Sequence, residues 1–497
     1  MQRPHQANFA MRRPGSPRAG KDTVSVKRLQ GMTILASMII IFGVVIAGFA
    51  SLSAETVNQS FSRPAPILAA ALLVSTLVEL RGGLRNVVRL DIFMMMVLFL
   101  LTFLEFLFPQ DDISYRITLD AAKTSASAAL VGFAGITIGR LFFMPRVAAN
   151  KFASFSVAPN NVFGLLLIST FIGYLNILLA VNFNIAEMFN QMMQPRFSQS
   201  WSRGRLGGLS TLLGELGLFK FLIAPLVGAM LAQAKRYNFI QLFVAILLLA
   251  LVLFEGFASG TRNIFLSNVM TFGASYTLLM RKPTIFNALK VWVPLLVVAA
   301  FSIQYLLTVR TFGLIGAMNQ EAPVVETERT VSVDMNLINI ALISDGFPER
   351  YQFLGLEIPY TAVIRPIPRA LWAGKPESIS VSIEEVTGAS DTITISATFV
   401  GEFWMAGGYL AIMIGALFLG ALAAWWNRIG AYATTTMRMI LFASAFFPAG
   451  IAMRSFMSAA PPVLPVIALA VIVTVFERRS RGRRNEQRFR HVPAKRV

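Results

Sequence analysis

The sequence predicts an all-α membrane protein with about twelve transmembrane helices and a large loop before the tenth. Three observations lead to this class. Apolar residues make up 55% of the chain and charged residues only 14%. Apolar blocks long enough to cross roughly 30 Å of hydrocarbon recur along the whole chain. One long polar segment, residues 313–403, separates the ninth block from the tenth.

The apolar blocks define the expected helices in order. They are residues 32–52, 65–80, 90–108, 120–139, 161–182, 209–233, 238–256, 262–280, 291–312, 404–425, 437–453 and 462–476. The first block follows a basic leader but is longer than the core of a signal peptide, so we expect a retained helix. Within the long loop, stretches 335–347 and 353–364 are too short to span; we expect them at the interface or re-entering the bundle.

The charge distribution predicts the orientation. The net charge is +19, and Lys and Arg gather in both tails and in the odd-numbered loops, where Arg89 and Arg140 lie. Such residues are enriched on the cytoplasmic side, so both termini are expected in the cytoplasm of a bacterium, with the protein in its inner membrane. This sorting by side explains the basic charge better than a nucleic-acid partner does. The expected units are a cytoplasmic tail 1–31, helices 1–9 in 32–312, a periplasmic loop 313–403, helices 10–12 in 404–476, and a cytoplasmic tail 477–497.

Several kinds of chemistry are disfavoured by the residues that are missing. The chain has no Cys, which excludes disulfides, iron–sulfur clusters and thiolate metal sites. Its two His residues, His5 and His491, lie in the tails, which disfavours a His base or a His-ligated metal. The sequence lacks a Walker loop, a Rossmann fingerprint, an HExxH motif and a cation-binding acidic cluster. We therefore expect no metal, no cofactor and metal-independent chemistry.

The most informative motif is the proline-rich basic run RPIPRALWAGKP, residues 365–376. It places Arg365, Arg369 and Lys375 on the expected outer side, where cations are normally scarce. Proline lowers the entropy cost of holding these cations in one arrangement, and arginine offers a bidentate fork to phosphate oxygens. Trp372 is suited to stacking on a sugar. The run therefore predicts an anion site; the competing interpretation is an interfacial anchor that binds lipid phosphates.

Other external arginines extend this hypothesis. The loop QPRFSQSWSRGRLGG carries Arg196, Arg203 and Arg205 among hydroxyls and glycines, next to a helix start that favours anions. Its competing interpretation is a loop that contacts lipid headgroups. Arg262 lies in the outer turn SGTRNIF, where an ion pair with Glu255 is the alternative role.

Ionisable residues near the expected membrane boundaries complete the candidate set. Arg310 lies near the outer end of the ninth block, and Glu402 lies where the long loop becomes the tenth. Glu402 is expected to orient an arginine or to accept a proton, although the helix dipole alone also favours a carboxylate there. Glu357 and Asp345 are the alternative bases. Lys220, in the sixth block, either faces a partner inside the bundle or snorkels to the interface.

These motifs together resemble the Wzy-type polymerases of O-antigen and related bacterial polysaccharides. The similar pieces are SGTRNIF (259–265), RPIPRALWAGKP (365–376), FVGEFWMAGGYLAIMIGALFLG (399–420) and, more loosely, the arginine-rich loop 196–208. The dozen helices and the large external loop late in the chain are similar too. Together the pieces cover under a fifth of the sequence.

The resemblance implies an architecture like that of GT-C polymerases and ligases, and block transfer of oligosaccharide at the periplasmic face. Polyprenyl-pyrophosphate-linked glycans are then the substrates, with membrane lipids, a flippase and a chain-length regulator as further partners. Arg365 and Arg369 are expected to stabilise the charge of the leaving pyrophosphate, and Glu402 to act on the acceptor hydroxyl. Arg196, Arg203, Arg205, Arg262, Arg310, Trp372 and Lys375 are the expected substrate-binding residues.

Three alternatives stay open at this point. An O-antigen ligase has a similar architecture, but such enzymes are usually associated with an external His that this chain lacks. A polysaccharide flippase or another transporter is disfavoured by the long loop and by the absence of an internal repeat. A non-catalytic scaffold for polysaccharide assembly predicts that single external arginines have no effect on glycan length.

Overall fold

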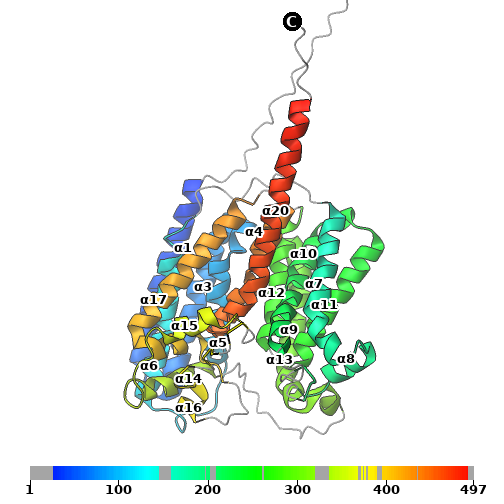
Figure 1. Ribbon diagram of the computed structural model, residues 1–497. Coiled ribbons are helices and arrows are strands. Elements are labelled where there is room, and N and C mark those ends of the chain that lie inside the picture. Colours follow the sequence, from blue (N-terminus) through cyan, green and yellow to red (C-terminus); the bar gives the residue numbers. More distant parts are fainter. Residues whose placement is uncertain are drawn as a thin grey trace, which may run out of the picture.

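A computed structural model describes residues 26–144, 158–195, 198–201, 209–259, 262–281, 283–318, 335–367, 371–372, 374–376, 379–388, 395–433 and 435–490. In these residues the chain forms helices and no strand, as the sequence predicts. The helices group into two lobes, each with its own hydrophobic core. Figure 1 shows the lobes side by side.

The first lobe combines the early helices with those of the long loop. It contains α1 (Val26–Leu52), α2 (Val57–Ser62), α3 (Pro64–Leu80), α4 (Leu84–Val87), α5 (Leu90–Thr102), η1 (Leu104–Leu107), α6 (Leu119–Gly139), α14 (Asn336–Gly346), α15 (Glu357–Ile364), α16 (Ile383–Thr387) and α17 (Thr398–Ala431). The loop helices are therefore part of this lobe's core and do not form a domain of their own.

The second lobe contains the middle of the chain and the last helix. Its elements are α7 (Pro159–Ala180), α8 (Ile185–Met192), α9 (Leu209–Gly217), η2 (Leu218–Leu222), α10 (Ile223–Ala232), η3 (Ala234–Arg236), α11 (Phe239–Ala258), α12 (Arg262–Leu279), α13 (Ile285–Met318) and α20 (Ala460–Arg490). Two short helices join the lobes. Helix α18 (Thr436–Ser444) contributes buried residues to both cores, whereas α19 (Phe446–Arg454) contributes to the first core and packs against α12 of the second lobe.

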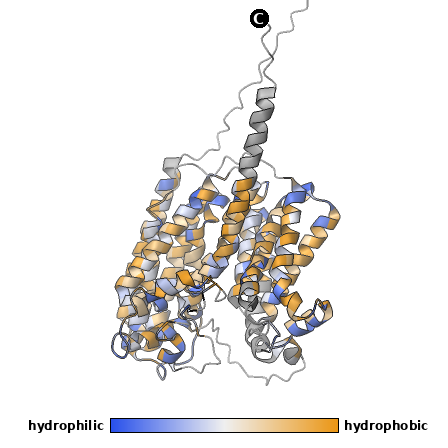
Figure 2. Ribbon diagram, viewed as in Figure 1, coloured by the Kyte–Doolittle hydropathy of each residue, from blue (hydrophilic) through white to orange (hydrophobic). Residues whose placement is uncertain are grey.

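The helices have the lengths and composition of membrane spans. Among the described residues, 8 helices are long and apolar enough to cross a bilayer, and four shorter apolar helices accompany them. Every one of the expected apolar blocks overlaps one of these helices. Figure 2 shows that apolar residues prevail along the helices of both lobes. Many of these side chains are exposed, among them Phe42, Phe239 and Leu410, as lipid-facing helices require. The all-α membrane class is thus confirmed, whereas the count of twelve spans stays a prediction.

The two ends of the bundle carry different parts of the chain. Helix α1 begins and helix α20 ends at the same end of the bundle (Figure 1). Helices α14 and α16 lie at the opposite end. This arrangement agrees with an even number of crossings. The side of the membrane that each end faces stays a prediction from charge.

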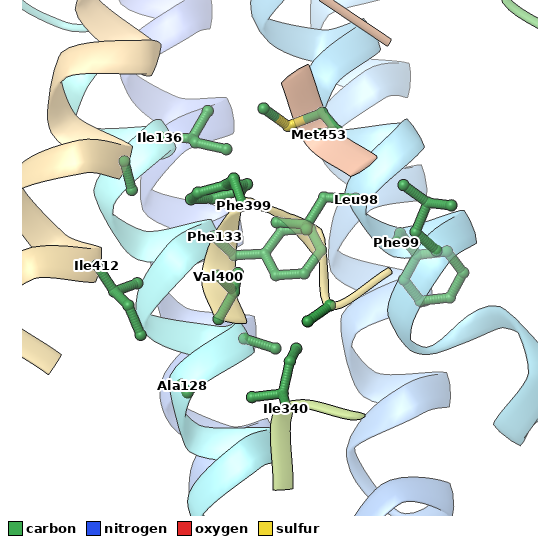
Figure 3. Packing of buried hydrophobic residues seen from close by; sticks show 14 of the residues in the cluster. Leu98, Phe99, Ala128, Phe133, Ile136, Ile340, Phe399, Val400, Ile412 and Met453 are labelled. Atoms are coloured by element: carbon green, nitrogen blue, oxygen red, sulfur yellow. The ribbon is translucent and has the colours of Figure 1, made fainter. Parts of the chain in front are cut away.

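Close packing of α6 against α17 forms the centre of the first lobe. A Cβ atom added to Gly139 would lie 2.3 Å from the carbonyl oxygen of Leu417, and one added to Gly420 would lie 2.3 Å from that of Ile136. Only glycine permits such an approach of two backbones. Figure 3 shows Phe133 of α6 and Phe399 of α17 beside each other, among other buried apolar side chains.

Candidate functional site

A break in α17 sets the position of Glu402. The helix begins at Thr398, six residues before the expected start, and is interrupted at Gly407 and Gly408, where Gly408 has φ +61°. The carbonyl groups freed at this break are satisfied from the long loop: Leu354 N–H donates to Met405 O at 2.8 Å, and Gly355 N–H donates to Ala406 O at 3.0 Å. Glu402 therefore lies on a short helical segment that is separate from the membrane span after it.

Glu402 binds the connection between α19 and α20. Its Oε1 accepts a hydrogen bond from the Ser455 hydroxyl at 2.5 Å. Its Oε2 accepts from the backbone N–H groups of Phe456 at 2.6 Å and Met457 at 3.1 Å. The carboxylate is buried, and both of its oxygens are engaged by protein donors. This geometry holds the start of the α19–α20 connection against α17.

A cavity of about 670 Å³ lies between the two lobes. Its walls come from η2, α12, α15, α16, the start of α17, α19 and the start of α20. The charged side chains that line it are Arg365, Lys375, Glu384, Glu402 and Arg454, and hydroxyls come from Thr361, Ser382, Ser396, Ser455 and Ser458. Cations together with many hydroxyl groups suit an anionic ligand that carries hydroxyls of its own.

Arg365 and Lys375 form the basic wall of the cavity. Arg365 is the residue that ends α15. Lys375 Nζ donates to the carbonyl oxygens of Arg365 and Ile367, each at 2.9 Å, and so folds the proline-rich run back on itself. The Arg365 guanidinium has no hydrogen-bond or ion-pair partner among the described residues, and the residue lines the cavity. It is therefore available to a ligand.

Three predicted site residues are brought together and others are not. Arg365, Lys375 and Glu402 all line the cavity. Trp372 is partly buried but does not line it. Arg196, Arg203, Arg205 and Arg369 lie outside the described residues, as do the side chains of Arg262 and Arg310. Helix α12 begins at Arg262, and Ile264 in its first turn lines the cavity.

The alternative bases lie elsewhere. Glu357 accepts hydrogen bonds from the N–H of Ser380 at 2.5 Å and from its hydroxyl at 2.6 Å, and it does not line the cavity. Burial and the nearby charge of Asp120 raise the pKa of Asp345, which also lies outside the lining. Glu384 of α16 lines the cavity and was not among the candidates.

Arg454 is the lining cation that sequence reasoning did not assign to the site. It ends α19, and its carbonyl oxygen accepts a hydrogen bond from the Ser396 hydroxyl at 3.0 Å. The adjacent residue, Ser455, is the one that Glu402 binds. Residues on both sides of the start of α17 therefore hold Arg454 in place. The available signal was a single arginine at the outer end of an apolar segment.

Glu255, the alternative ion-pair partner of Arg262, has Lys220 as a partner among the described side chains. Glu255 forms an ion pair with Lys220, which lies in the 3₁₀ turn between α9 and α10. Lys220 therefore does not snorkel to the interface. Its backbone approaches α7 so closely that a Cβ at Gly173 would lie 2.4 Å from its nitrogen. The break between α9 and α10, where Lys220 lies, and the neighbouring helix α11, which carries Glu255, bring the two charges together.

Neither a metal site nor a similarity to known proteins assigns a function to the cavity. Within the described part of the chain, no group of three or more His, Cys, Asp or Glu side chains has the arrangement of a metal site. No protein-family model, curated protein or solved structure matches this chain. The function is therefore argued from the geometry of the cavity.

Proposed function

We propose that this protein polymerises polyprenyl-pyrophosphate-linked oligosaccharide repeat units at the periplasmic face of a bacterial inner membrane. The observation that supports this most is the cavity between the lobes. It gathers Arg365, Lys375 and Glu402, which the motifs had assigned to one site. Helix α15, which lines the cavity, lies in the part of the bundle away from the start of α1 (Figure 1). The product is O-antigen or an exopolysaccharide.

The proposed reaction transfers a growing glycan to a new repeat unit. The acceptor hydroxyl oxygen forms a bond to the anomeric carbon of the donor, and the bond from that carbon to the phosphate oxygen breaks. The leaving polyprenyl pyrophosphate keeps the electron pair. Arg365 is suited to bind its oxygens with two parallel hydrogen bonds, while Lys375 and Arg454 add positive charge from the neighbouring walls. Arg369 and the external arginines at 196, 203, 205, 262 and 310 stay candidates for the remaining phosphate contacts.

The two carboxylates of the cavity have different proposed roles. Glu402 already accepts three hydrogen bonds, so we assign it to holding Arg454 and Ser455 at the cavity wall. Glu384 of α16 also lines the cavity, and no hydrogen bond or ion pair engages its carboxylate among the described residues. It is the better candidate to accept the proton that the acceptor hydroxyl loses.

The topology that this function requires is part of the proposal. Twelve spans would place both basic tails in the cytoplasm and the cavity at the periplasmic side, where flipped lipid-linked units are found. The described helices provide eight long and four shorter apolar segments for this arrangement. A flippase that supplies the units and a chain-length regulator are the expected partners.

The proposed function is tested by substituting Arg365 in the cavity wall. Arg365→Lys keeps the charge but loses the bidentate geometry, so we expect it to shorten the polymer nearly as strongly as Arg365→Ala. The purified variants are reconstituted in vesicles with synthetic polyprenyl-pyrophosphate repeat units, and product length is read on a gel. Arg350→Lys is the matched control, because Arg350 is exposed on the same loop but does not line the cavity.

The outcomes separate the competing functions. Polymer of normal length from Arg365→Lys would remove the pyrophosphate role of this residue. Transfer of finished glycan to a lipid A-core acceptor, without polymerisation, would identify a ligase. Movement of the lipid-linked unit across the vesicle membrane with no new glycosidic bond would identify a flippase.

A further inference from the structure

Helix α15 has three distinct faces. Thr361, Ile364 and Arg365 line the cavity. Ile358 belongs to the core of the first lobe, and Ala362 is also buried. The remaining face is apolar and uncovered: Leu356 is 83% exposed, Tyr360 49% and Val363 73%. Spacings of four and three residues place these side chains on one stripe of a helix, on the side away from Arg365.

The exposed stripe continues a lipid-facing surface. In α17, Leu410 is 71% exposed and Ile414 59%, as expected for side chains of a membrane span that face acyl chains. The hydrogen bond from Gly355 N–H to Ala406 O places the residue before Leu356 beside the break where this span begins. The uncovered face of α15 therefore starts next to the outermost turn of a membrane helix.

The residues around α15 in the sequence match a membrane surface as well. Arg365 caps the helix and is exposed, Arg350 is exposed in the turn after α14, and Leu371 beyond α15 is 79% exposed. Apolar side chains flanked by arginine suit the boundary between acyl chains and anionic headgroups. A water-facing helix of this length would leave these apolar side chains in contact with water, which is unfavourable.

We propose that α15 is an interfacial helix that lies in the outer boundary of the bilayer, with Leu356, Tyr360 and Val363 among the lipid acyl chains. The helix then forms the wall between the bilayer and the cavity. Its opposite face presents Arg365 to the cavity near the level of the lipid phosphates. An anionic amphiphile can keep its tail in the membrane on one side of α15 and place its head in the cavity on the other. This inference concerns the membrane surface and holds whether or not the chain polymerises glycans.

The experiment uses the absence of cysteine in this chain. Single-cysteine variants Leu356→Cys and Val363→Cys are labelled with an environment-sensitive fluorophore. The full-length protein is then reconstituted in nanodiscs of phosphatidylethanolamine and phosphatidylglycerol. Quenching by lipids that carry a nitroxide near the headgroup is compared with quenching by iodide in the buffer. Ile414→Cys on α17 and Glu385→Cys, exposed on α16, are the lipid and water controls.

We expect the probes at positions 356 and 363 to show blue-shifted emission and to be quenched more strongly by the lipid nitroxide than by iodide, as at position 414. Stronger quenching by iodide at both positions, as at position 385, would overturn the proposal. Protection from both quenchers would also overturn it and would assign this face to a contact with a second copy of the chain.

Discussion

Two groups of charged side chains lie at opposite ends of the helix bundle and differ in what satisfies their charges. The first, which we call the buried network, consists of Glu79, Arg89, Asp91 and Arg140 in the first lobe. The second is the cavity set, Arg365, Lys375, Glu384, Glu402 and Arg454. Both groups combine arginine with carboxylate side chains. The cavity set borders a volume of about 670 Å³, and no residue of the buried network lines that cavity.

The buried network is paired within the protein. Arg89 binds both oxygens of Asp91, at 3.0 and 2.7 Å, and contacts Glu79 at 3.2 Å. Arg140 reaches Asp91 at 3.4 Å. Polar neighbours complete the hydrogen bonds: they are Thr33, Ser37, Asn86 and Asn427. Two positive and two negative charges cancel, as buried ions require.

The side chains of the cavity set differ in whether the protein supplies their hydrogen-bond partners. Glu402 is fully engaged by backbone and hydroxyl donors, whereas the Arg365 guanidinium has no such partner among the described residues. The comparison teaches that the presence of charge at a helix end does not mark a site. A charge that faces a cavity, with its own partner missing, is the better indicator.

The largest fall in stability is expected from a substitution that breaks the buried network. Asp91→Ala leaves Arg89 and Arg140 with Glu79 as the only carboxylate, and removing one partner of a buried ion pair costs about 3–5 kcal/mol of stability. We expect a large fall in the apparent unfolding temperature of the purified protein. Asp111→Ala, at an exposed position, is the control. Equal unfolding temperatures for the two variants would mean that the network does not hold the first lobe together.

A smaller loss of stability is expected from substitution of Glu402. Glu402→Ala leaves the N–H groups of Phe456 and Met457 without their acceptor, a loss of about 1–3 kcal/mol. Glu402→Gln keeps an oxygen for these groups and an amide for the Ser455 hydroxyl, so we expect its stability and polymerisation to stay close to normal. Thermal unfolding and glycan length are measured for both variants. A Gln variant that is stable but inactive would assign Glu402 to proton transfer and reject the positioning role.

The smallest effect on stability is expected at Arg365. Arg365→Ala removes an exposed side chain without a partner among the described residues, so the free energy of unfolding should change by no more than about 0.5 kcal/mol. Polymerisation should nevertheless be lost. Unfolding temperature and product length are compared with those of Arg350→Ala. Destabilisation as large as that of Glu402→Ala would show that Arg365 belongs with the structural charges, and the contrast between the two groups would fail.

The sequence by itself determined the class of the protein and the position of its helices. Both follow from local properties, because the length and apolarity of a segment decide whether it can satisfy its backbone inside a membrane. The same local reasoning selected Arg365, Lys375 and Glu402, whose residue types and flanking prolines or glycines are visible in short motifs.

Only the tertiary structure decided which charges are paired and which face the cavity. Arg89 and Arg140 read as ordinary cytoplasmic loop cations, yet both are buried against Asp91, and Asn427 reaches that same carboxylate from a helix 336 positions away. Contacts between separate helices also place Arg454 in the cavity lining and Lys220 in an ion pair with Glu255. The physical reason is that an ion pair depends on distances between helices, and hydropathy and charge counts along the chain contain no information about those distances.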